Sequence, residues 1–326
     1  MTLTRRSFLA VAAGAAAAAA GAAFPSLALG ANKPLTIGFS QVGAESEWRS
    51  ANTASIKDAA RKAGVTLKFA DAQQRQENQV KAIRSFIAQR VDVIAFSPVV
   101  ETGWDTVLRE AKNAKIPVIL TDRAVKVSDP SLYVSFIGSD FVEEGRRAGR
   151  WLLDYDKKIG GKPLNVVELQ GTVGSAPATD RKTGFAEVIA ANPKLKIIRS
   201  QTGDFTRAKG KEVMEAFLKS EGKNINVLFA HNDDMAIGAI QAIEEAGLKP
   251  GKDIVIVSID GVKGAFEAMM QGKLNVTVEC NPLLGPTLIQ TAHAVVAGQP
   301  VPKRVTVAEG VFPAEAAAKA FPSRKY

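Results

Sequence analysis

Short apolar runs alternate with longer stretches of helical periodicity through the first 140 residues of the chain. The apolar runs predict buried strands at 35–40, 65–71, 91–97 and 116–122. The stretches between them predict helices at 47–64, 77–90 and 104–115. Strands that are buried on both faces and separated by helices indicate a parallel sheet with helices on either side.

The same pattern begins again after the apolar run at 132–138. Helices are predicted at 140–156, 178–191, 206–220 and 233–246, and strands at 164–170, 196–201, 225–230 and 253–260. The halves share no recognisable repeat in sequence. We therefore predict an α/β protein with two doubly wound parallel-sheet lobes.

The first 30 residues have the pattern of an export signal. Arg5 and Arg6 form a short basic region, an uncharged alanine-rich stretch follows at 8–24, and small residues at 25–30 suit a cleavage site. The adjacent arginines resemble the bacterial twin-arginine signal. A retained membrane anchor is the alternative, but alanine anchors weakly, so we expect residues 1–30 to be removed.

Length and charge narrow the class of protein further. Removal of the signal leaves about 295 residues, which suits two domains of ordinary size better than one. It also removes two positive charges and no negative ones, so the formal net charge falls from +9 to +7. The basic residues are scattered at element ends, with no basic run interleaved with aromatics. We therefore expect no nucleic-acid partner.

Cysteine and histidine usage argues against metal and redox sites. Cys280 is the one cysteine, so no internal disulfide can form, and we expect a small buried residue there. His231 and His293 have no second histidine or cysteine nearby at zinc spacing. We expect no metal centre and no cofactor, although calcium held by oxygen atoms alone would leave no such spacing.

Polar residues gather where the predicted strands end. The segments are SQVGAESEWR at 40–49, TDR at 121–123, GTVGSAPATDR at 171–181, TGDFTR at 202–207, HNDD at 231–234 and DG at 260–261. Open parallel sheets bind ligands outside the carboxyl ends of their strands. The sequence therefore predicts a ligand site at one edge of both sheets.

These segments, in this order and over essentially the whole mature chain, resemble the periplasmic sugar-binding proteins of ABC importers, in the ribose and galactose group. The resemblance implies two lobes joined by a hinge of three crossing segments, with a sugar in the cleft between them. It implies lobes formed by 32–137 plus 281–308 and by 138–280 plus 309–326. It also implies a periplasmic monomer that binds a neutral monosaccharide, galactofuranose or a related aldose or pentose, and delivers it to an inner-membrane permease.

The resemblance also implies which residues contact the sugar. Those of the first lobe are Glu45, Trp48, Arg49, Asp122 and Arg123. Those of the second lobe are Arg181, Asn232 and Asp260, with Phe205 and Glu279 at positions that usually face the sugar. Residues 280–304 resemble the family less closely.

The residue types suit a sugar independently of the resemblance. A sugar ring presents one apolar face and a rim of hydroxyl groups, so its site needs an aromatic plate and directional polar groups. Trp48 can be the plate, while arginines donate and carboxylates accept. Simpler roles stay open: Trp48 as core, the charged residues as salt bridges, and Asn232 as a helix cap.

Charge separates the remaining classes of ligand and function. Three arginines against four carboxylates leave the predicted cleft slightly negative, which favours a neutral sugar over an anion. A glycosidase with Asp122 and Asp260 as its acid and base is the rival class, but the neighbouring arginines should keep both carboxylates ionised, and no nucleophile elbow or phosphate loop follows any strand. We therefore expect no enzyme. A sugar-sensing protein for a chemoreceptor or sensor kinase would use the same cleft and is the alternative.

Overall fold

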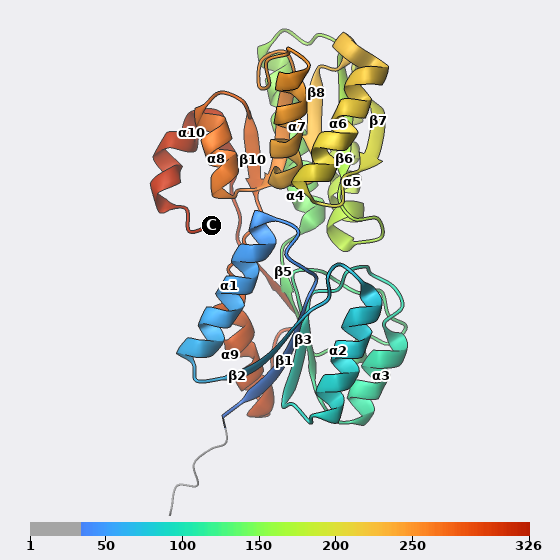
Figure 1. The fold of residues 1–326 in the computed structure, drawn as a ribbon, viewed down its shortest axis with the longest axis vertical. Coiled ribbons are helices and arrows are strands. Elements are labelled where there is room, and N and C mark those ends of the chain that lie inside the picture. The colour runs from blue at the N-terminus through green and yellow to red at the C-terminus, as the bar shows by residue number, and fades with distance from the viewer. Residues whose placement is uncertain (1–33) are drawn as a thin grey trace, which may run out of the picture. The chain divides into compact units, whose positions relative to one another are not determined.

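The computed structural model describes residues 34–326, so the predicted export signal at 1–30 lies outside the described range. Within that range the chain forms two six-stranded sheets, each packed between helices (Figure 1). This arrangement confirms the predicted α/β class with two doubly wound sheets. Among the described helices, none combines the length and the apolar character needed to cross a membrane.

The first sheet is parallel throughout, in the order β11-β5-β4-β3-β1-β2. Its strands are β1 Thr36–Gln41, β2 Thr66–Asp71, β3 Val93–Phe96, β4 Val118–Thr121, β5 Ser135–Gly138 and β11 Arg304–Thr306. The first five lie within or beside the predicted strands. The sixth, β11, comes from near the end of the chain, where the pattern predicted no strand.

Four helices cover this sheet: α1 Glu47–Lys62, α2 Gln76–Ala88, α3 Asp105–Asn113 and α9 Gly285–Val296. Ile56 of α1 and Leu288 of α9 share one apolar core with β1. Ile83 of α2 and Leu108 of α3 share another, on the opposite face. Both faces of the sheet are therefore buried, as continuous apolar strands require.

The second sheet has the order β12-β10-β9-β8-β6-β7. Its strands are β6 Leu164–Gln170, β7 Leu195–Thr202, β8 Val227–Ala230, β9 Val255–Asp260, β10 Val276–Glu279 and β12 Val311–Pro313. The edge strand β12, in a segment where no strand was predicted, pairs with β10 in the antiparallel sense, whereas the other strands of this sheet are parallel. The chain reaches β12 from the first sheet and therefore runs in the opposite direction.

The helices of the second sheet are α4 Phe141–Lys158, α5 Ala176–Ile189, α6 Arg207–Glu221, α7 Asp233–Glu245, α8 Lys263–Met270 and α10 Ala314–Ala320. Single 3-10 turns occur in the described chain at Pro130–Leu132, Gly222–Asn224 and Phe321–Ser323. Helices α4 and α5 touch backbone to backbone. A Cβ atom at Gly145 would lie 2.2 Å from the carbonyl oxygen of Arg181, so only glycine permits this approach. The contact fixes α5, which carries Arg181.

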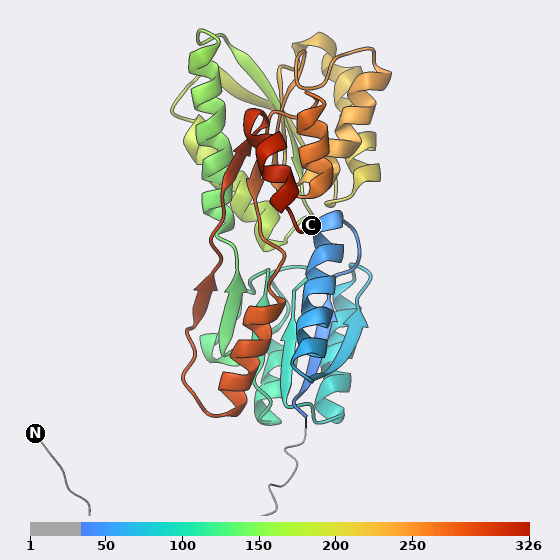
Figure 2. The ribbon, with the colours of Figure 1, turned by 90° about the vertical axis from the view of Figure 1, so that its left-hand side faces the viewer.

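Three segments cross between the two sheets (Figure 2). They are residues 139–140 after β5, residues 280–284 after β10, and residues 307–310 between β11 and β12. We refer to the elements packed on the first and second sheet as the first and second lobe. The parallel strands of each sheet end toward the other lobe, so the loops after them face one another; only β12 among the described strands runs the other way.

Candidate ligand-binding site

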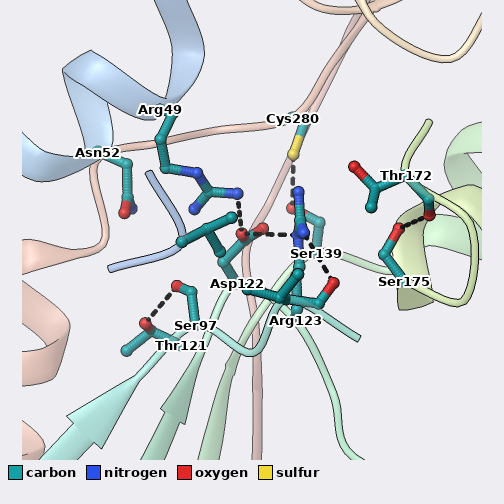
Figure 3. Close-up of polar contacts among 12 residues, drawn as sticks. Arg49, Asn52, Ser97, Thr121, Asp122, Arg123, Ser139, Thr172, Ser175 and Cys280 are labelled. Carbon is teal, nitrogen blue, oxygen red and sulfur yellow. Dashed lines mark hydrogen bonds and ion pairs between the residues drawn. The ribbon is translucent and has the colours of Figure 1, made fainter. Parts of the chain in front are cut away.

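A cavity lies where the loops of the two lobes meet. Its lining residues are Glu45, Ser46, Trp48, Arg49, Asp122, Arg123, Pro177, Arg181, Phe205, Asn232, Asp260 and Cys280. Nine of the ten predicted contact residues are among them, and Glu279 is not. Figure 3 shows part of this lining, with Arg49, Asp122, Arg123 and Cys280 facing a common space.

The first lobe presents its side chains from two strand ends. Ser46 caps α1, since its Oγ accepts a hydrogen bond of 3.0 Å from the backbone N–H of Arg49. Trp48 and Arg49 therefore lie in the first turn of α1, just beyond β1. Asp122 follows β4 with a φ of 62°. A Cβ atom at Gly138 would lie 2.6 Å from the carbonyl oxygen of Asp122, so glycine at 138 permits this turn.

Arg49 organises the first-lobe carboxylates. Its Nε donates to Glu45 Oε1 at 3.0 Å, and its Nη2 lies 2.7 Å from Asp122 Oδ2. Its Nη1 donates to Gln41 Oε1 at 3.2 Å. Burial lowers the pKa of Arg49, but the charges of Asp122 and Glu45 outweigh burial, and the pKa is raised. The guanidinium is thus a fixed cation that orients two carboxylates.

Arg123 is less completely paired. It is 2% exposed, and its Nη1 donates to the carbonyl oxygen of Val99 at 3.2 Å. Its Nε is buried without a hydrogen-bond partner among the described residues, as is Glu45 Oε2. Burial and the nearby charge of Arg49 lower the pKa of Arg123 to about 10. These atoms are a donor and an acceptor that a ligand hydroxyl can satisfy.

Arg181 is the corresponding cation of the second lobe. Its Nε donates to Glu144 Oε2 at 2.7 Å, and its Nη1 donates to the carbonyl oxygen of His231. Its Nη2 lies 3.5 Å from Asp260 Oδ1. Burial opposes the charge, but the carboxylates of Glu144 and Asp260 raise the pKa of Arg181. Arg181 therefore remains charged at the cavity wall.

The aromatic side chains of the lining are anchored. The indole N–H of Trp48 donates to the carbonyl oxygen of Cys280 at 2.6 Å, and the ring is 4% exposed. Trp48 also belongs to the apolar core beneath the second sheet, so its ring both packs in the core and lines the cavity. Phe205 has a φ of 63°, and its ring centroid lies 5.2 Å from the guanidinium carbon of Arg123 in the other lobe.

Asn232 caps a helix and lines the cavity at once. Its Oδ1 accepts from the backbone N–H of Met235 at 3.0 Å, at the start of α7. Its Nδ2 donates to the carbonyl oxygen of Phe205 at 3.1 Å, which leaves one N–H free to face the cavity. The side chain therefore ties together two of the lining segments.

The pKa of Asp260 is shifted in the direction opposite to the one that a neighbouring arginine alone would cause. Asp260 ends β9 with a φ of 134° and is 3% exposed. Burial raises the pKa of Asp260 well above its usual range, and the charge of Arg181 opposes this shift only in part. For Glu45 burial also raises the pKa, but the charges of Arg49 and Arg123 outweigh it and lower the pKa. For Asp260, the charge of a single guanidinium at 3.5 Å does not offset the rise in pKa that burial causes.

Glu279 lies outside the lining, contrary to the sequence expectation. Its Oε1 accepts hydrogen bonds from Arg324 Nη1 at 2.7 Å and from the hydroxyl of Tyr326 at 2.8 Å. Its Oε2 accepts from the backbone N–H of Gly310 at 3.0 Å. The C-terminal residues thus hold this carboxylate. Without it the lining has three arginines and three carboxylates, so the cavity is balanced rather than negative.

The cavity lining offers oxygen atoms but no obvious place for a cation. Glu45, Asp122 and Asp260 each lie within 4.0 Å of an arginine nitrogen. The lining contains no histidine among the described residues. His231 lies behind it, with Nε2 3.1 Å from Glu168 Oε1. Positive charge is therefore supplied by arginines, which suits a ligand rich in hydroxyl groups.

Contacts between the lobes flank the cavity. Arg207 of the second lobe lies 2.9 Å from Glu47 Oε2 of the first lobe, and its Nε donates to Asp234 Oδ1 at 2.6 Å. The backbone N–H of Glu47 donates to Asp234 Oδ2 at 2.8 Å. On another loop, the N–H of Glu101 donates to the carbonyl oxygen of Gly174 at 2.9 Å. The structure is thus a closed arrangement of the lobes.

Three lining residues were not predicted: Ser46, Pro177 and Cys280. Ser46 precedes the predicted contacts of α1 and could have been found as an N-cap. Pro177 lies in the first turn of α5, which the position of Arg181 implies. Cys280 was expected to be buried, and it is 1% exposed, but nothing in its sequence context indicated contact with the cavity.

Residues 37–300 match the family model of the periplasmic binding protein domain. The galactofuranose-binding protein YtfQ of Escherichia coli K12 is 60% identical over 268 residues, which cover 81% of this chain and 83% of that protein. The chain belongs to the periplasmic binding protein family. Its members are binding proteins, so the predicted absence of enzymatic function agrees with the family.

Solved structures agree with this assignment. A protein from Mycobacterium smegmatis in complex with β-D-fucofuranose matches with a TM-score of 0.87 and 61% identity, covering 90% of this chain and 95% of that one. The binding protein of the arabinose ABC transporter from Shewanella sp. ANA-3, bound to α- and β-L-arabinofuranose, matches with a TM-score of 0.85 and 54% identity, covering 89% and 95%. The predicted fold and family are confirmed.

Proposed function

We propose that this protein is the solute-binding component of an ABC importer and that it holds one neutral furanose sugar in the cavity between its lobes. The observation that carries the proposal is the lining itself. Side chains from both lobes surround one small space, with guanidinium donors and carboxylate acceptors in equal number beside two anchored aromatic rings. Such a surface matches a small ring with hydroxyl groups and no net charge.

The relatives support a five-membered ring. Their names and complexes include galactofuranose, fucofuranose and arabinofuranose, which differ in their substituents but share the furanose ring. We therefore infer that the cavity discriminates between furanose and pyranose rings more strongly than between sugars with different substituents. A sugar acid or phosphate is disfavoured, because each arginine of the lining is already paired with a carboxylate.

We assign the ligand contacts to the nine predicted residues that line the cavity. Arg49, Arg123, Arg181 and Asn232 are donors, Glu45, Asp122 and Asp260 are acceptors, and Trp48 and Phe205 are apolar surfaces. Hydrogen bonds to charged groups are worth roughly 1.5 to 3 kcal/mol each, so few are needed for micromolar binding at about −8.2 kcal/mol. Glu279 has no part in this set.

We propose that closure follows binding. The lobes, 32–137 plus 281–308 and 138–280 plus 309–326, would move about the three crossing segments. Sugar bound to both lobes stabilises the closed form, since the open form offers only part of the contacts. An inner-membrane permease would then recognise the closed, loaded protein, which acts as a monomer in the periplasm.

Ring-locked compounds test the proposed ligand most sharply. Isothermal calorimetry should detect binding of 1,4-anhydrogalactitol, which can form only a five-membered ring, and much weaker binding of 1,5-anhydrogalactitol, whose ring has six members. L-Arabinose and D-galactose serve as further ligands, and glucose 6-phosphate as the anionic control. Preference for the six-membered ring, or for the phosphate, would contradict the proposal.

Transport and export need separate tests. Deletion of the gene should abolish uptake of radiolabelled arabinose or galactose at low concentration, and the wild-type gene should restore it.

For the twin-arginine route, a variant with Arg5→Lys and Arg6→Lys should accumulate in the cytoplasm in unprocessed form. Normal export of this variant would point to the general secretory route.

A further inference from the structure

The three crossing segments meet at one group of side chains, which we call the hinge cluster: Ser139, Glu144, Cys280 and Glu309. Ser139 belongs to the first crossing, Cys280 to the second and Glu309 to the third. Glu144 joins them from the first turn of α4. The cluster therefore includes one residue of every segment about which the lobes can move.

The contacts within the hinge cluster are direct. Glu309 Oε1 accepts hydrogen bonds from the hydroxyl of Ser139 and from the backbone N–H of Asn281, the latter at 3.0 Å. The hydroxyl of Ser139 lies 3.4 Å from Cys280 Sγ (Figure 3). Cys280 Sγ and a carboxylate oxygen from each of Glu144 and Glu309 all lie within 4.8 Å of one another. Two acidic groups thus face each other at the thiol.

Glu144 connects this cluster to the cavity. Its side chain is 1% exposed, and its Oε2 accepts from Arg181 Nε at 2.7 Å. Its Oε1 is buried and has no hydrogen-bond partner among the described residues. Arg181 in turn reaches the cavity, where its Nη2 lies 3.5 Å from Asp260 Oδ1. One carboxylate therefore links a ligand-contacting arginine to the hinge.

Glu144 is buried and Glu309 is half-buried, so two adjacent carboxylates with little access to water would repel each other if both were charged. Within residues 34–326, Arg181 is the one guanidinium that forms an ion pair with either carboxylate, and it also pairs with Asp260. Burial, and then the charge of Glu144, raise the pKa of Glu309 to about 8. Burial also raises the pKa of Glu144. A proton held by the pair removes one negative charge and supplies a donor for Glu144 Oε1.

Other charged groups around Glu309 do not replace that proton. Arg147 of α4 donates to the backbone carbonyl of Glu309 at 2.8 Å, not to its carboxylate. Arg304 of β11 donates to the carbonyl oxygen of Ser139 at 2.6 Å. Burial raises the pKa of the Cys280 thiol well above its usual range, so the thiol stays neutral and can donate but adds no charge.

We propose that Glu144 and Glu309 share one proton in the closed protein, and that this pair couples Arg181 to the three crossing segments and thereby sets the pH dependence of closure. Glu144 is then a positioning residue, since it acts on the sugar through Arg181. The inference rests on the proposed function for its sugar-binding readout. It is independent of which furanose is bound.

The direction of the pH effect follows from proton linkage. A carboxyl group with a raised pKa keeps its proton in the folded, closed protein at pH values where the unfolded chain has released it. The closed protein then binds more protons, and its stability falls as pH rises from the ordinary carboxyl range through about 8. Sugar affinity should fall in the same direction if opening exposes the pair to water.

The central experiment compares Glu309→Gln with Glu309→Ala. Glutamine keeps an acceptor for Ser139 and Asn281 and donates at every pH, whereas alanine removes both functions. We expect wild-type affinity for L-arabinose or D-galactose to fall at least about threefold between pH 6 and 9, with a clearly smaller fall in Glu309→Gln. Glu309→Ala should bind poorly throughout. The exposed carboxylate of Glu187 provides the matched control, Glu187→Gln, which should keep the wild-type profile.

Several results would overturn the proposal. One is a pH profile for Glu309→Gln as steep as that of the wild type, since Asp233 and Asp260 also have raised pKa values and would then account for the dependence. Another is an equal loss of sugar affinity in Glu309→Gln and Glu309→Ala at every pH. A third is a zinc-dependent rise in melting temperature in the wild type but not in Cys280→Ala, which would make a metal ion the occupant of the cluster.

A measurement without sugar separates this inference from the proposed function. Thermal unfolding across the same pH range should show a smaller loss of stability with rising pH in Glu309→Gln than in the wild type. If no furanose binds, the proposed function fails, yet this comparison still decides the proton assignment. If furanoses bind and the two unfolding profiles run parallel, the proton assignment fails alone.

Discussion

Arg49 Nη2 lies 2.7 Å from Asp122 Oδ2, between side chains that are 3% and 5% exposed. The same guanidinium donates to Glu45 and to Gln41, so its donors are largely committed to the protein. Arg49 therefore serves the ligand chiefly by fixing the two carboxylates that accept from hydroxyl groups. This arrangement uses the planar, three-sided geometry of guanidinium, which lysine lacks.

We expect Arg49→Lys to weaken sugar binding at least about tenfold, because an ammonium group cannot hold Glu45, Asp122 and Gln41 in place together. Calorimetry with the preferred furanose measures the change. Arg84→Lys is the matched control, since Arg84 pairs with Glu110 at the surface and should keep wild-type affinity. Equal affinities in the two variants would contradict the assignment.

Trp48 offers a graded test of the aromatic plate. Trp48→Ala removes both the ring and its N–H donor to Cys280, and we expect affinity to fall at least about tenfold. Trp48→Phe keeps a plate and should lose less. Trp151, which stacks on Tyr155 of the same helix α4, provides the control variant Trp151→Phe. If Trp48→Ala binds the sugar with wild-type affinity, Trp48 is a core residue and not a ligand contact.

Arg123 has a buried Nε that forms no hydrogen bond with the described residues, although Asp122 Oδ2 lies 3.6 Å from it. If that Nε donates to the sugar, Arg123→Ala should weaken binding at least about tenfold, or roughly 1.4 kcal/mol. Arg109→Ala, at an exposed position paired with Asp105, is the control. Unchanged calorimetric affinity in Arg123→Ala would remove it from the site.

Arg207 joins the lobes at the surface rather than in the cavity. Its side chain is 48% exposed and that of Glu47 is 33% exposed, so this contact between the lobes is screened, whereas Asp234, its partner within the second lobe, is only 4% exposed. Exposed pairs are worth about 0.2 to 1 kcal/mol, so Arg207→Ala should lower affinity by about fivefold at most, through faster dissociation. Stopped-flow measurements at low and high salt should show the effect shrinking with salt, whereas Lys209→Ala should have none.

The sequence allowed the elements around the site to be predicted because each strand and helix of residues 35–260 carries its own periodicity. The end of a parallel strand then implies where its loop lies. Glu45, Asp122, Arg181 and Asp260 could be brought together on that basis. The distances between these side chains could not be predicted, because pairing across up to 215 residues depends on tertiary packing, which local sequence patterns do not encode.

Glu279, which the family resemblance places near the sugar, lies outside the cavity lining. Its position at the end of β10 resembles that of the site residues, and β10 adjoins β9, which carries Asp260. Its carboxylate nevertheless pairs with Arg324 and Tyr326, which return to the hinge from the C-terminus. A contact between residues 45 and 47 positions apart leaves no trace in either segment alone. The strands β11 and β12 escaped prediction for the same reason, being three residues long and defined by their partners.

Asp233 supports the site from behind and allows a stability test. Its carboxylate accepts from the backbone N–H groups of Gly261 and Val262 at 2.7 and 3.0 Å. It also accepts from the hydroxyls of Ser258 and Thr277. The turn that positions Asp260 therefore depends on one buried side chain, which is 0% exposed.

Asp233→Ala leaves these buried donors without their acceptor, so we expect it to lower the free energy of unfolding by about 3 kcal/mol or more. Asp233→Asn keeps one acceptor oxygen and should lose less, although its amide adds a donor where donors already converge. Urea unfolding measures both variants, and Asp58→Ala, at an exposed carboxylate, is the control. Sugar affinity should fall in both Asp233 variants, because Asp260 loses its support. An unfolding free energy for Asp233→Ala within about 0.5 kcal/mol of the wild type would show that the turn holds without this carboxylate.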